Sequence, residues 1–159
     1  MKTKTIQGGD KLQAFFKKIT SGKAELNVGF LDSEQAKIAI KNEFGGVFPI
    51  SDEYRARAKA KGIILGNTIA IPSRPFMQRT VDENTNKWGK VIQKISPQLE
   101  FDLTKVLNTL GQVVVDDIAE TIEMGEFVAN SARTIAIKQR GKPLVDSGDM
   151  VNNINYEVK

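Results

Sequence analysis

The run SPQLEFDLTKVLNTLGQVVVDDIAETIEMG, residues 96–125, decides the fold of this chain. Its apolar residues recur every three or four positions, which places them on one stripe of an amphipathic helix. They are Leu99, Leu103, Val106, Leu107, Leu110, Val114, Ile118 and Ile122. Ser96 is a good N-cap, Pro97 suits the first helical position, and Gly125 suits the end. The pattern predicts a helix of about seven turns and roughly 40 Å, the longest element and the spine of the fold.

Three elements are predicted before residue 46. A helix over residues 10–20 is indicated by apolar residues at helical spacing, namely Leu12, Phe15, Phe16 and Ile19. Residues 24–30 alternate polar and apolar side chains, which predicts a strand with Leu26, Val28 and Phe30 on one face. Asp32 or Ser33 then caps a helix that runs to Phe44 and stops at Gly45-Gly46.

Four elements are predicted around and after the long helix. A helix begins near Pro75 and carries apolar residues at helical spacing as far as Ile95. Residues 130–138 form a short helix or turn. Asp146 or Ser147 can cap a single helical turn that ends near residue 152. Residues 154–158 alternate and predict a closing strand.

The stretch 51–71 has a different pattern. Four cations alternate with other residues there: Arg55, Arg57, Lys59 and Lys61. They would line one face of a strand or spread around a helix. Two β-rich apolar runs then flank Gly66-Asn67, a pair typical of a two-residue turn. These features predict a hairpin over residues 59–71, in a basic arm of about residues 51–71 that projects from the core.

Together these elements predict one α+β domain over residues 1–159. We expect a small antiparallel sheet packed against one long helix and two or three shorter helices. With 159 residues the chain can bury a core without disulfides, and it has no Cys. The absence of Cys fits a reducing compartment. No apolar run reaches membrane-spanning length, and the first ten residues lack the apolar core of a signal peptide. The sequence therefore predicts a cytosolic protein with no membrane contact.

Composition also limits the kinds of catalytic and metal sites that the chain can form. The chain contains no His and no Cys, the usual general base near neutral pH and the usual soft metal ligands. Serine or cysteine triads and zinc, haem or iron–sulfur sites are therefore not expected. One carboxylate-only alternative stays open, because Asp116, Glu120 and Glu123 share a helix face and could bind magnesium in a nuclease. A solvated acidic face is the favoured interpretation. We predict no enzyme and no cofactor.

The basic segment has two interpretations. Net charge is +4 and the pI is about 9.3, a mild basic bias. The cations of residues 54–61 could contact phosphates, which would make the chain a DNA-binding module. The favoured alternative is that they form a solvated loop or an arm that docks on an acidic protein surface. Tyr54 is the single aromatic residue among them, so a base-stacking surface has little support.

Two segments carry a resemblance to a known family. The first reads NEFGG at residues 42–46 and, after an insertion, IPSRPFM at residues 71–77. The second holds Asn130-Ser131, Thr134 and Lys138, followed by PLVDSG at residues 143–148 and INYEV at residues 154–158. In this order, over residues 24–159, the chain resembles the phage tail-completion or neck proteins, the group that includes the virion morphogenesis protein G of phage Mu. Ser147 stands where the family usually has Thr.

The resemblance implies a structural virion protein. Such a protein is made in the cytoplasm of the host bacterium and forms a ring between the head connector and the tail. Its expected partners are further copies of itself, connector proteins and tail proteins, with DNA only as cargo that passes through the channel. The motif residues are then structural: Gly45, Gly46, Pro72, Arg74, Pro75, Phe76, Pro143, Leu144, Asp146 and Gly148.

These motif residues have a physical interpretation. Pro72 and Pro75 bracket Arg74 and fix a strand-to-helix corner. The Arg74 guanidinium is then held where it meets a carboxylate or a backbone carbonyl, within the subunit or across an interface. Phe76 packs under the corner. Asp146 can bond to nearby amides, and Gly148 permits tight geometry. The candidate interface residues are Arg55, Arg57, Lys59 and Lys61.

Overall fold

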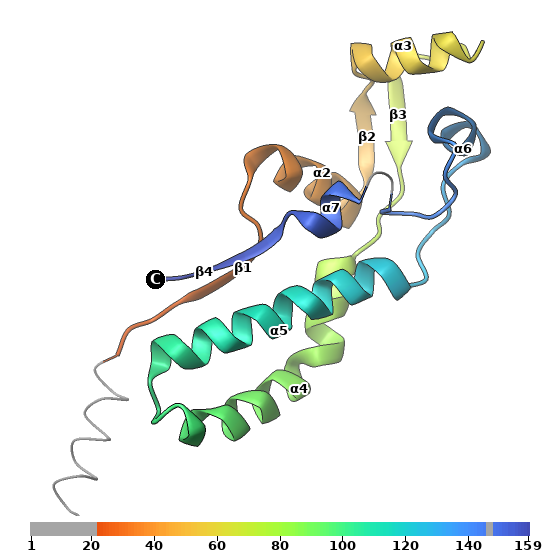
Figure 1. Cartoon of the computed structure of the whole chain (residues 1–159). Helices are drawn as coiled ribbons and strands as arrows, with labels where there is room; N and C mark the ends of the chain where they lie inside the picture. Colours follow the sequence, from red (N-terminus) through yellow and green to blue (C-terminus); the bar gives the residue numbers. More distant parts are fainter. Residues whose placement is uncertain (1–21, 146–147) are drawn as a thin grey trace, which may run out of the picture.

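A computed structural model describes residues 22–145 and 148–159 of the chain. Within them the fold is mixed α+β, with six helices and four strands (Figure 1). This confirms the predicted fold class. The helix expected over residues 10–20 lies outside the described residues, as do Asp146 and Ser147.

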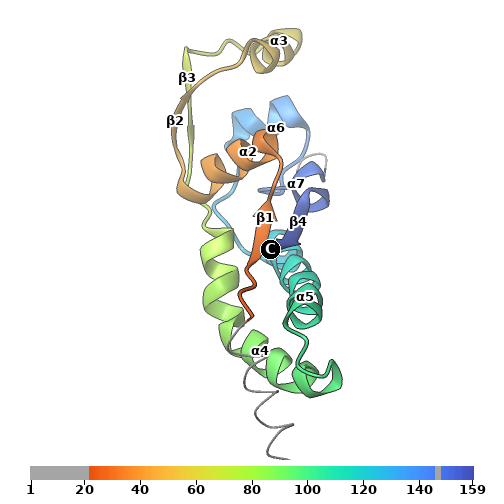
Figure 2. The ribbon, with the colours of Figure 1, turned by 90° about the vertical axis from the view of Figure 1, so that its left-hand side faces the viewer.

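The body of the molecule contains one antiparallel pair of strands. β1 (Leu26–Phe30) pairs with β4 (Ile154–Val158), with Val28 opposite Tyr156. Both strands were predicted, and the register brings the two ends of the described chain together. α5 (Leu103–Met124) packs against both strands, and α4 (Phe76–Gln98) packs against α5 (Figure 2).

The predicted long helix starts later than expected. Asp102, not Ser96, is its N-cap, because the Asp102 carboxylate accepts a hydrogen bond from the Lys105 N–H at 3.2 Å. Ser96 and Pro97 instead lie in the last turn of α4, so this pair falls at the end of one helix and not at the start of the next. Glu100 and Phe101 take positive φ angles and turn the chain between the helices. The spine is therefore a pair of helices of 23 and 22 residues.

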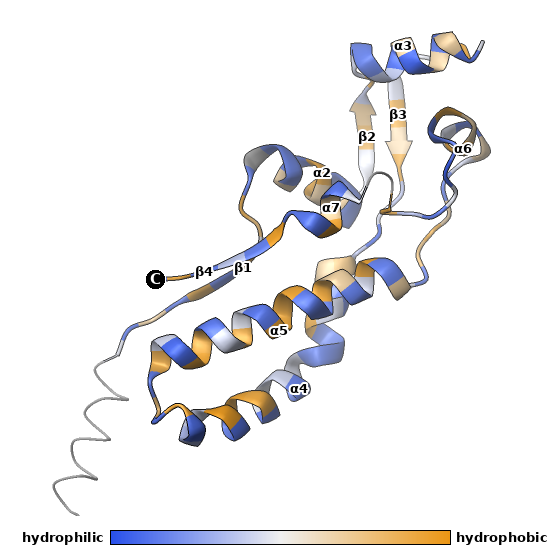
Figure 3. Ribbon diagram, viewed as in Figure 1, coloured by the Kyte–Doolittle hydropathy of each residue, from blue (hydrophilic) through white to orange (hydrophobic). Residues whose placement is uncertain are grey.

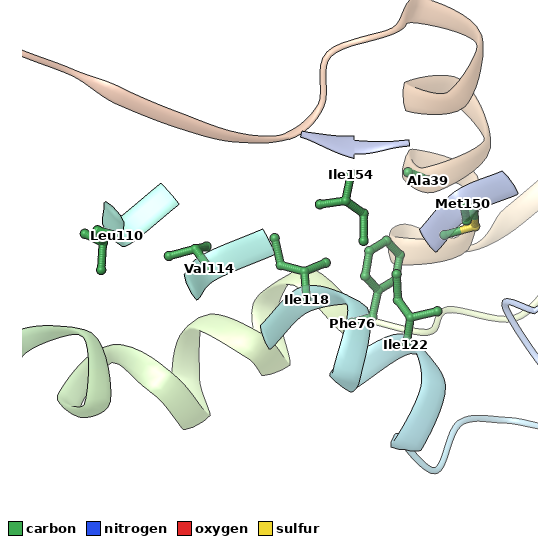
Figure 4. Packing of buried hydrophobic residues seen from close by; sticks show 8 residues of the cluster. All are labelled: Ala39, Phe76, Leu110, Val114, Ile118, Ile122, Met150 and Ile154. Carbon is green, nitrogen blue, oxygen red and sulfur yellow. The ribbon is translucent and has the colours of Figure 1, made fainter. Parts of the chain in front are cut away.

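The apolar stripe of α5 builds the core, as predicted. Leu110, Val114, Ile118 and Ile122 are buried at intervals of four residues and belong to one core cluster with Ile154 of β4 (Figure 4). Phe76 joins them from the first turn of α4 and is fully buried. Its ring meets Phe30 of β1 edge to face, with centroids 6.0 Å apart. Burial of these side chains packs both α5 and the first turn of α4 against the strands.

Three shorter helices complete the body. In α2 (Ser33–Phe44) the Asp32 carboxylate accepts from the amides of Glu34 and Gln35, which confirms the predicted cap. α6 (Ala132–Lys138) begins after Ser131, whose hydroxyl accepts from the Thr134 N–H. α7 (Asp149–Asn152) has Gly148 at its N-cap, with φ of 89° and no side-chain cap. The predicted helical turn that ends near residue 152 is confirmed. Its expected cap falls on Asp146 or Ser147, which lie outside the described residues, so that cap stays a prediction.

The predicted hairpin over residues 59–71 does not form. β3 (Thr68–Ile71) pairs with β2 (Gly46–Pro49), and the residues between them include α3 (Asp52–Ala60). Ser51 caps α3, and its alanine, arginine and lysine residues favour a helix over a strand. The turn expected at Gly66-Asn67 is thus replaced by a helix-bearing connection. The described residues form two separate two-stranded sheets where one was expected.

Candidate functional site

The second sheet and α3 form an arm that stands apart from the body. β2 and β3 rise from the point where α2 ends and α4 begins, and α3 lies across their far end (Figure 1). Both strands carry hydrophobic residues although the arm is detached from the core (Figure 3). We call residues 46–71 the arm. The junction is the group of residues at its base, namely Asn42, Glu43, Gly45, Arg74, Val128 and Asn130.

Arg74 is the centre of the junction. The residue is only 4% exposed. Its guanidinium donates from Nε to the Val128 carbonyl at 2.8 Å, from Nη1 to Asn42 Oδ1 at 3.2 Å and from Nη2 to Asn130 Oδ1 at 3.0 Å. Its backbone N–H donates to the Asn42 carbonyl at 2.7 Å. The expected contact of Arg74 with a backbone carbonyl within the subunit is confirmed.

The junction joins the segments that carry the family resemblance. Asn42 lies in the last turn of α2, Arg74 lies in the corner and Asn130 precedes α6, so residues far apart in the sequence share one guanidinium. Burial lowers the pKa of Arg74 below its usual value. Arginine remains charged even so. The buried guanidinium is therefore stabilised by three neutral oxygen acceptors, one backbone carbonyl and two side-chain amides, and not by a carboxylate.

Glu43 is a junction residue that stands in the NEFGG segment but was not among the predicted site residues. Its buried carboxylate accepts hydrogen bonds from the amides of Met77 and Gln78, at 2.9 and 3.0 Å. These amides are at the start of α4, where Pro75 occupies the N-cap and provides no side-chain bond. Glu43 thus caps α4 from another helix, and its negative charge suits the positive end of the helix dipole. The signal in the sequence was a helix start without a capping side chain.

The remaining motif residues are divided between the junction and the body. Gly45 and Gly46 connect α2 to β2, and Gly46 pairs with Ile71. Phe76 packs under the corner as predicted, while Pro72 and Pro75 are exposed. Leu144, half-buried beside Pro143, contacts the core with a φ of 63°. Asp146 lies outside the described residues, so its expected bonds stay a prediction.

The four predicted interface cations lie on or beside a helix, and they differ in their partners. Arg55 donates to the Gly66 carbonyl at 3.2 Å, which ties α3 to the segment that returns to the body. Arg57 pairs with Glu53 at 2.7 Å on the exposed surface of α3. Lys59 and Lys61 are exposed, and within the described residues neither makes an ion pair. We call these two lysines the free cations of the arm.

The tip of the arm has a defined conformation. The Ile63 N–H donates to the Ala58 carbonyl at 2.9 Å, and the Gly62 N–H donates to the Lys59 carbonyl at 3.0 Å. With Gly62 at φ 68°, this is a Schellman motif that ends α3. Ala58 is fully buried under the turn. The next side chain, Ile64, is 91% exposed. The turn thus presents an apolar residue next to two free lysines.

The acidic residues of α5 divide into two kinds. Asp116, Glu120 and Glu123 are exposed, as the favoured interpretation predicted. No group of three or more metal-ligating side chains occurs within residues 22–145 and 148–159. Asp117, which no sequence pattern distinguishes from its neighbours, is only 4% exposed. It accepts a hydrogen bond from Trp88 Nε1 at 2.7 Å and forms an ion pair with Lys87, and so connects α5 to α4.

Replacing Asp117 by alanine should weaken this connection. The indole N–H of Trp88 loses its acceptor in a half-buried position, and we expect the free energy of unfolding to fall by about 2–3 kcal/mol. Asp117→Asn retains an acceptor oxygen and should cost about 1 kcal/mol. Urea unfolding, monitored by the fluorescence of the single tryptophan, measures both. Equal losses in the two variants would contradict the assignment of Trp88 as the main partner.

Two hollows lie on the described surface. An apolar groove of about 450 Å³ lies between β1, α2 and the start of α4, and its lining includes Ile40, Phe44, Met77 and Val81. A second, polar groove of about 280 Å³ lies between α4 and the end of α5. Its lining includes Arg79, Glu83, Asn84, Glu120 and Met124. Neither groove is lined by the whole acidic trio of α5 that a magnesium site would need.

Comparison of the chain with family models, with curated proteins and with solved structures finds no match. The family resemblance therefore rests on the residues of the two motif segments alone. Among the helices of the described ranges, none combines the length and the apolar character that crossing a membrane requires.

Proposed function

We propose that this protein is a structural component of a phage neck, which joins the head connector to the tail and assembles as a ring around the DNA channel. One observation carries the proposal: the arm holds the basic helix α3 clear of the body on two strands (Figure 2). An element that leaves its own core in this way has most of its surface available to another molecule. The proposal assigns no reaction and no cofactor to the chain.

The junction supports the proposal by explaining how the arm is held. Arg74 and Glu43 connect the end of α2 to the start of α4, the two places between which the arm leaves the body, through buried charged groups with several hydrogen bonds each. Such groups are costly to bury, so they specify one geometry when all of them are satisfied. An arm with a fixed direction suits a ring, where every copy must meet its neighbour at the same angle.

The location of the protein in the particle tests the function. Cryo-electron microscopy of the head–tail junction of purified virions should show this chain as a ring between connector and tail. A particle that lacks the chain would reject the neck function. Density elsewhere in the virion would keep the structural role and reject the position.

Removing the cations of the arm should lower assembly without unfolding the body. We expect the variant with Arg55, Arg57, Lys59 and Lys61 all replaced by serine to reduce the yield of virions several-fold. Because these side chains are on a detached helix, the Tm of the body should move by less than about 2 °C. The matched control replaces Lys90 and Lys94, exposed lysines of α4, by serine and should leave the yield unchanged. Normal yields from the arm variant would contradict the proposal.

A DNA-binding module is the second candidate, favoured by the two free cations of the arm. Two features limit it. Arg55 and Arg57 already have partners in the chain. The whole net charge of +4 also comes from residues 1–21, with five lysines and one aspartate, since the rest of the chain has 18 basic and 18 acidic residues. The arm therefore does not account for the net positive charge of the chain.

Salt dependence separates the candidates. If Lys59 and Lys61 contact phosphates, duplex affinity should fall about tenfold between 50 and 200 mM salt, and about 150-fold if all four cations do. The neck function needs no such affinity. We expect gel shifts at the two salt concentrations to be the same for the natural chain and for the variant with Lys59→Ser and Lys61→Ser. Binding that these changes abolish would move the DNA-binding function to first place.

A further inference from the structure

The tip of the arm is a small surface of mixed character. Ile64 is 91% exposed and follows directly from the Schellman turn that ends α3. Lys59 and Lys61 lie in the last turn of the helix and at its C-cap. An apolar side chain this exposed gains by burial against a partner. Two free cations beside it favour a partner surface that is acidic.

A surface with the opposite character lies on the same chain. Glu120 and Met124, in the last turns of α5, line the polar groove between α4 and α5. Glu123 lies next to Glu120 on the helix surface, outside the lining of the groove. Met124 is 77% exposed, and both glutamates are exposed. The last turn of α5 contains no basic residue, so the negative end of the helix dipole meets acidic side chains. A cation supplied from outside would relieve this repulsion.

The tip cannot be the partner of the groove in its own chain. In both views the strands of the arm hold α3 away from the α4–α5 pair (Figures 1 and 2). The groove begins beside Arg79, close to the base of the arm, whereas Ile64 is at the far end. A contact between these two surfaces would therefore have to join two copies.

We propose that the arm tip of one copy docks on the α4–α5 groove of a second copy. Ile64 packs against Met124, and Lys59 and Lys61 face Glu120 and Glu123. The contact joins two different patches, so it is heterologous and adds copies head to tail until a ring closes. This inference deepens the proposed function and rests on its ring, but it names a contact that can be tested separately.

Disulfide cross-linking tests the contact directly, because the natural chain has no Cys. The double variant Ile64→Cys with Met124→Cys is oxidised as concentrated purified protein and in assembled particles. A heterologous contact gives a ladder of covalent oligomers on a non-reducing gel. Each single variant should give no ladder, and at most a dimer if two like sites meet by collision. A double variant that stays monomeric in both preparations overturns the contact.

Charge reversal tests the ionic part in the same double variant. Lys59→Glu with Lys61→Glu should lower the yield of adduct about five- to tenfold, and so should Glu120→Lys with Glu123→Lys. Mixing the two reversed chains, or combining all four changes, should restore it. Lys90→Glu with Lys94→Glu is the matched control and should have no effect. If all reversals leave the ladder unchanged, the docking of Lys59 and Lys61 on these glutamates is overturned.

The outcomes separate the contact from the function. A particle that contains the chain but yields no ladder rejects the contact and leaves the neck function standing. A ladder from purified protein, together with a particle that lacks the chain, supports head-to-tail association and rejects the neck function. Absence of both the ladder and the chain from the particle rejects both.

Discussion

Arg74→Ala should lower the free energy of unfolding more than any other single side-chain truncation outside the apolar core. The change leaves the Val128 carbonyl and the amide oxygens of Asn42 and Asn130 without their donor at a partly buried junction. Charged hydrogen bonds contribute about 1.5–3 kcal/mol each, and they are not additive. We expect a loss of about 4 kcal/mol, which lowers Tm by roughly 10 °C for a chain of this size.

Two variants show which property of Arg74 matters. Arg74→Lys keeps the charge but cannot reach three acceptors in one plane, and we expect it to cost about half as much as alanine. Arg57→Ala removes an exposed ion pair with Glu53 and should cost less than about 1 kcal/mol. Thermal unfolding followed by circular dichroism measures all three. A value for Arg74→Ala as small as that of Arg57→Ala would show that the junction does not depend on the guanidinium.

Gly45→Ala should have an effect of similar size for a different reason. Gly45 takes φ 65° and ψ −175°, a region that is essentially restricted to glycine. A Cβ there would lie 2.5 Å from the Ser73 backbone nitrogen and 2.8 Å from the Ile71 carbonyl oxygen. Backbone strain and overpacking each cost about 1–3 kcal/mol. We expect a combined loss of about 3–5 kcal/mol, unless the arm moves to relieve the overlap.

Two glycines of the arm separate the effect of backbone strain from the effect of steric overlap. Gly62 has φ 68°, but no heavy atom lies within 4 Å of the position that a Cβ would take, so Gly62→Ala costs strain alone. That strain is about 1 kcal/mol. Gly66 has neither strain nor close neighbours, so Gly66→Ala should be nearly neutral. Urea unfolding should show the largest loss of unfolding free energy for Gly45→Ala, a smaller loss for Gly62→Ala and the smallest for Gly66→Ala. Equal losses at 45 and 62 would mean that the close packing of β3 on Gly45 is absent in solution.

If the arm moves to relieve the overlap at Gly45, its direction changes. The tip would then miss the groove of the neighbouring copy, and the cross-linking ladder from Ile64→Cys with Met124→Cys should weaken even where the protein stays folded. Gly66→Ala should keep the ladder intact. The stability and the geometry of the junction are thus measured by two different readouts.

Elements whose signals are local could be predicted from the amino-acid sequence. The stripe from Leu110 to Ile122 predicted the buried face of α5, because residues spaced at the 3.6-residue period lie on one side of a helix whatever the helix packs against. The alternation in residues 26–30 and 154–158 predicted the two strands of the body for the same reason. Asp32 predicted a helix start because a cap bonds to amides within three residues. Arg74 was identified as a corner residue from the prolines around it.

Features that depend on partners distant in the sequence became visible only in three dimensions. The cap of α4 comes from Glu43, more than 30 residues earlier. The sequence around Pro75 could show that a capping side chain was missing there, but not which residue supplies the cap. The partner of β3 is β2, whereas the local turn signal at Gly66-Asn67 favoured a hairpin within residues 59–71. Asp117 differs from Asp116 only in the direction it faces, toward Trp88 instead of solvent. Local sequence sets backbone preference, whereas burial and long-range hydrogen bonds choose which of the permitted contacts form.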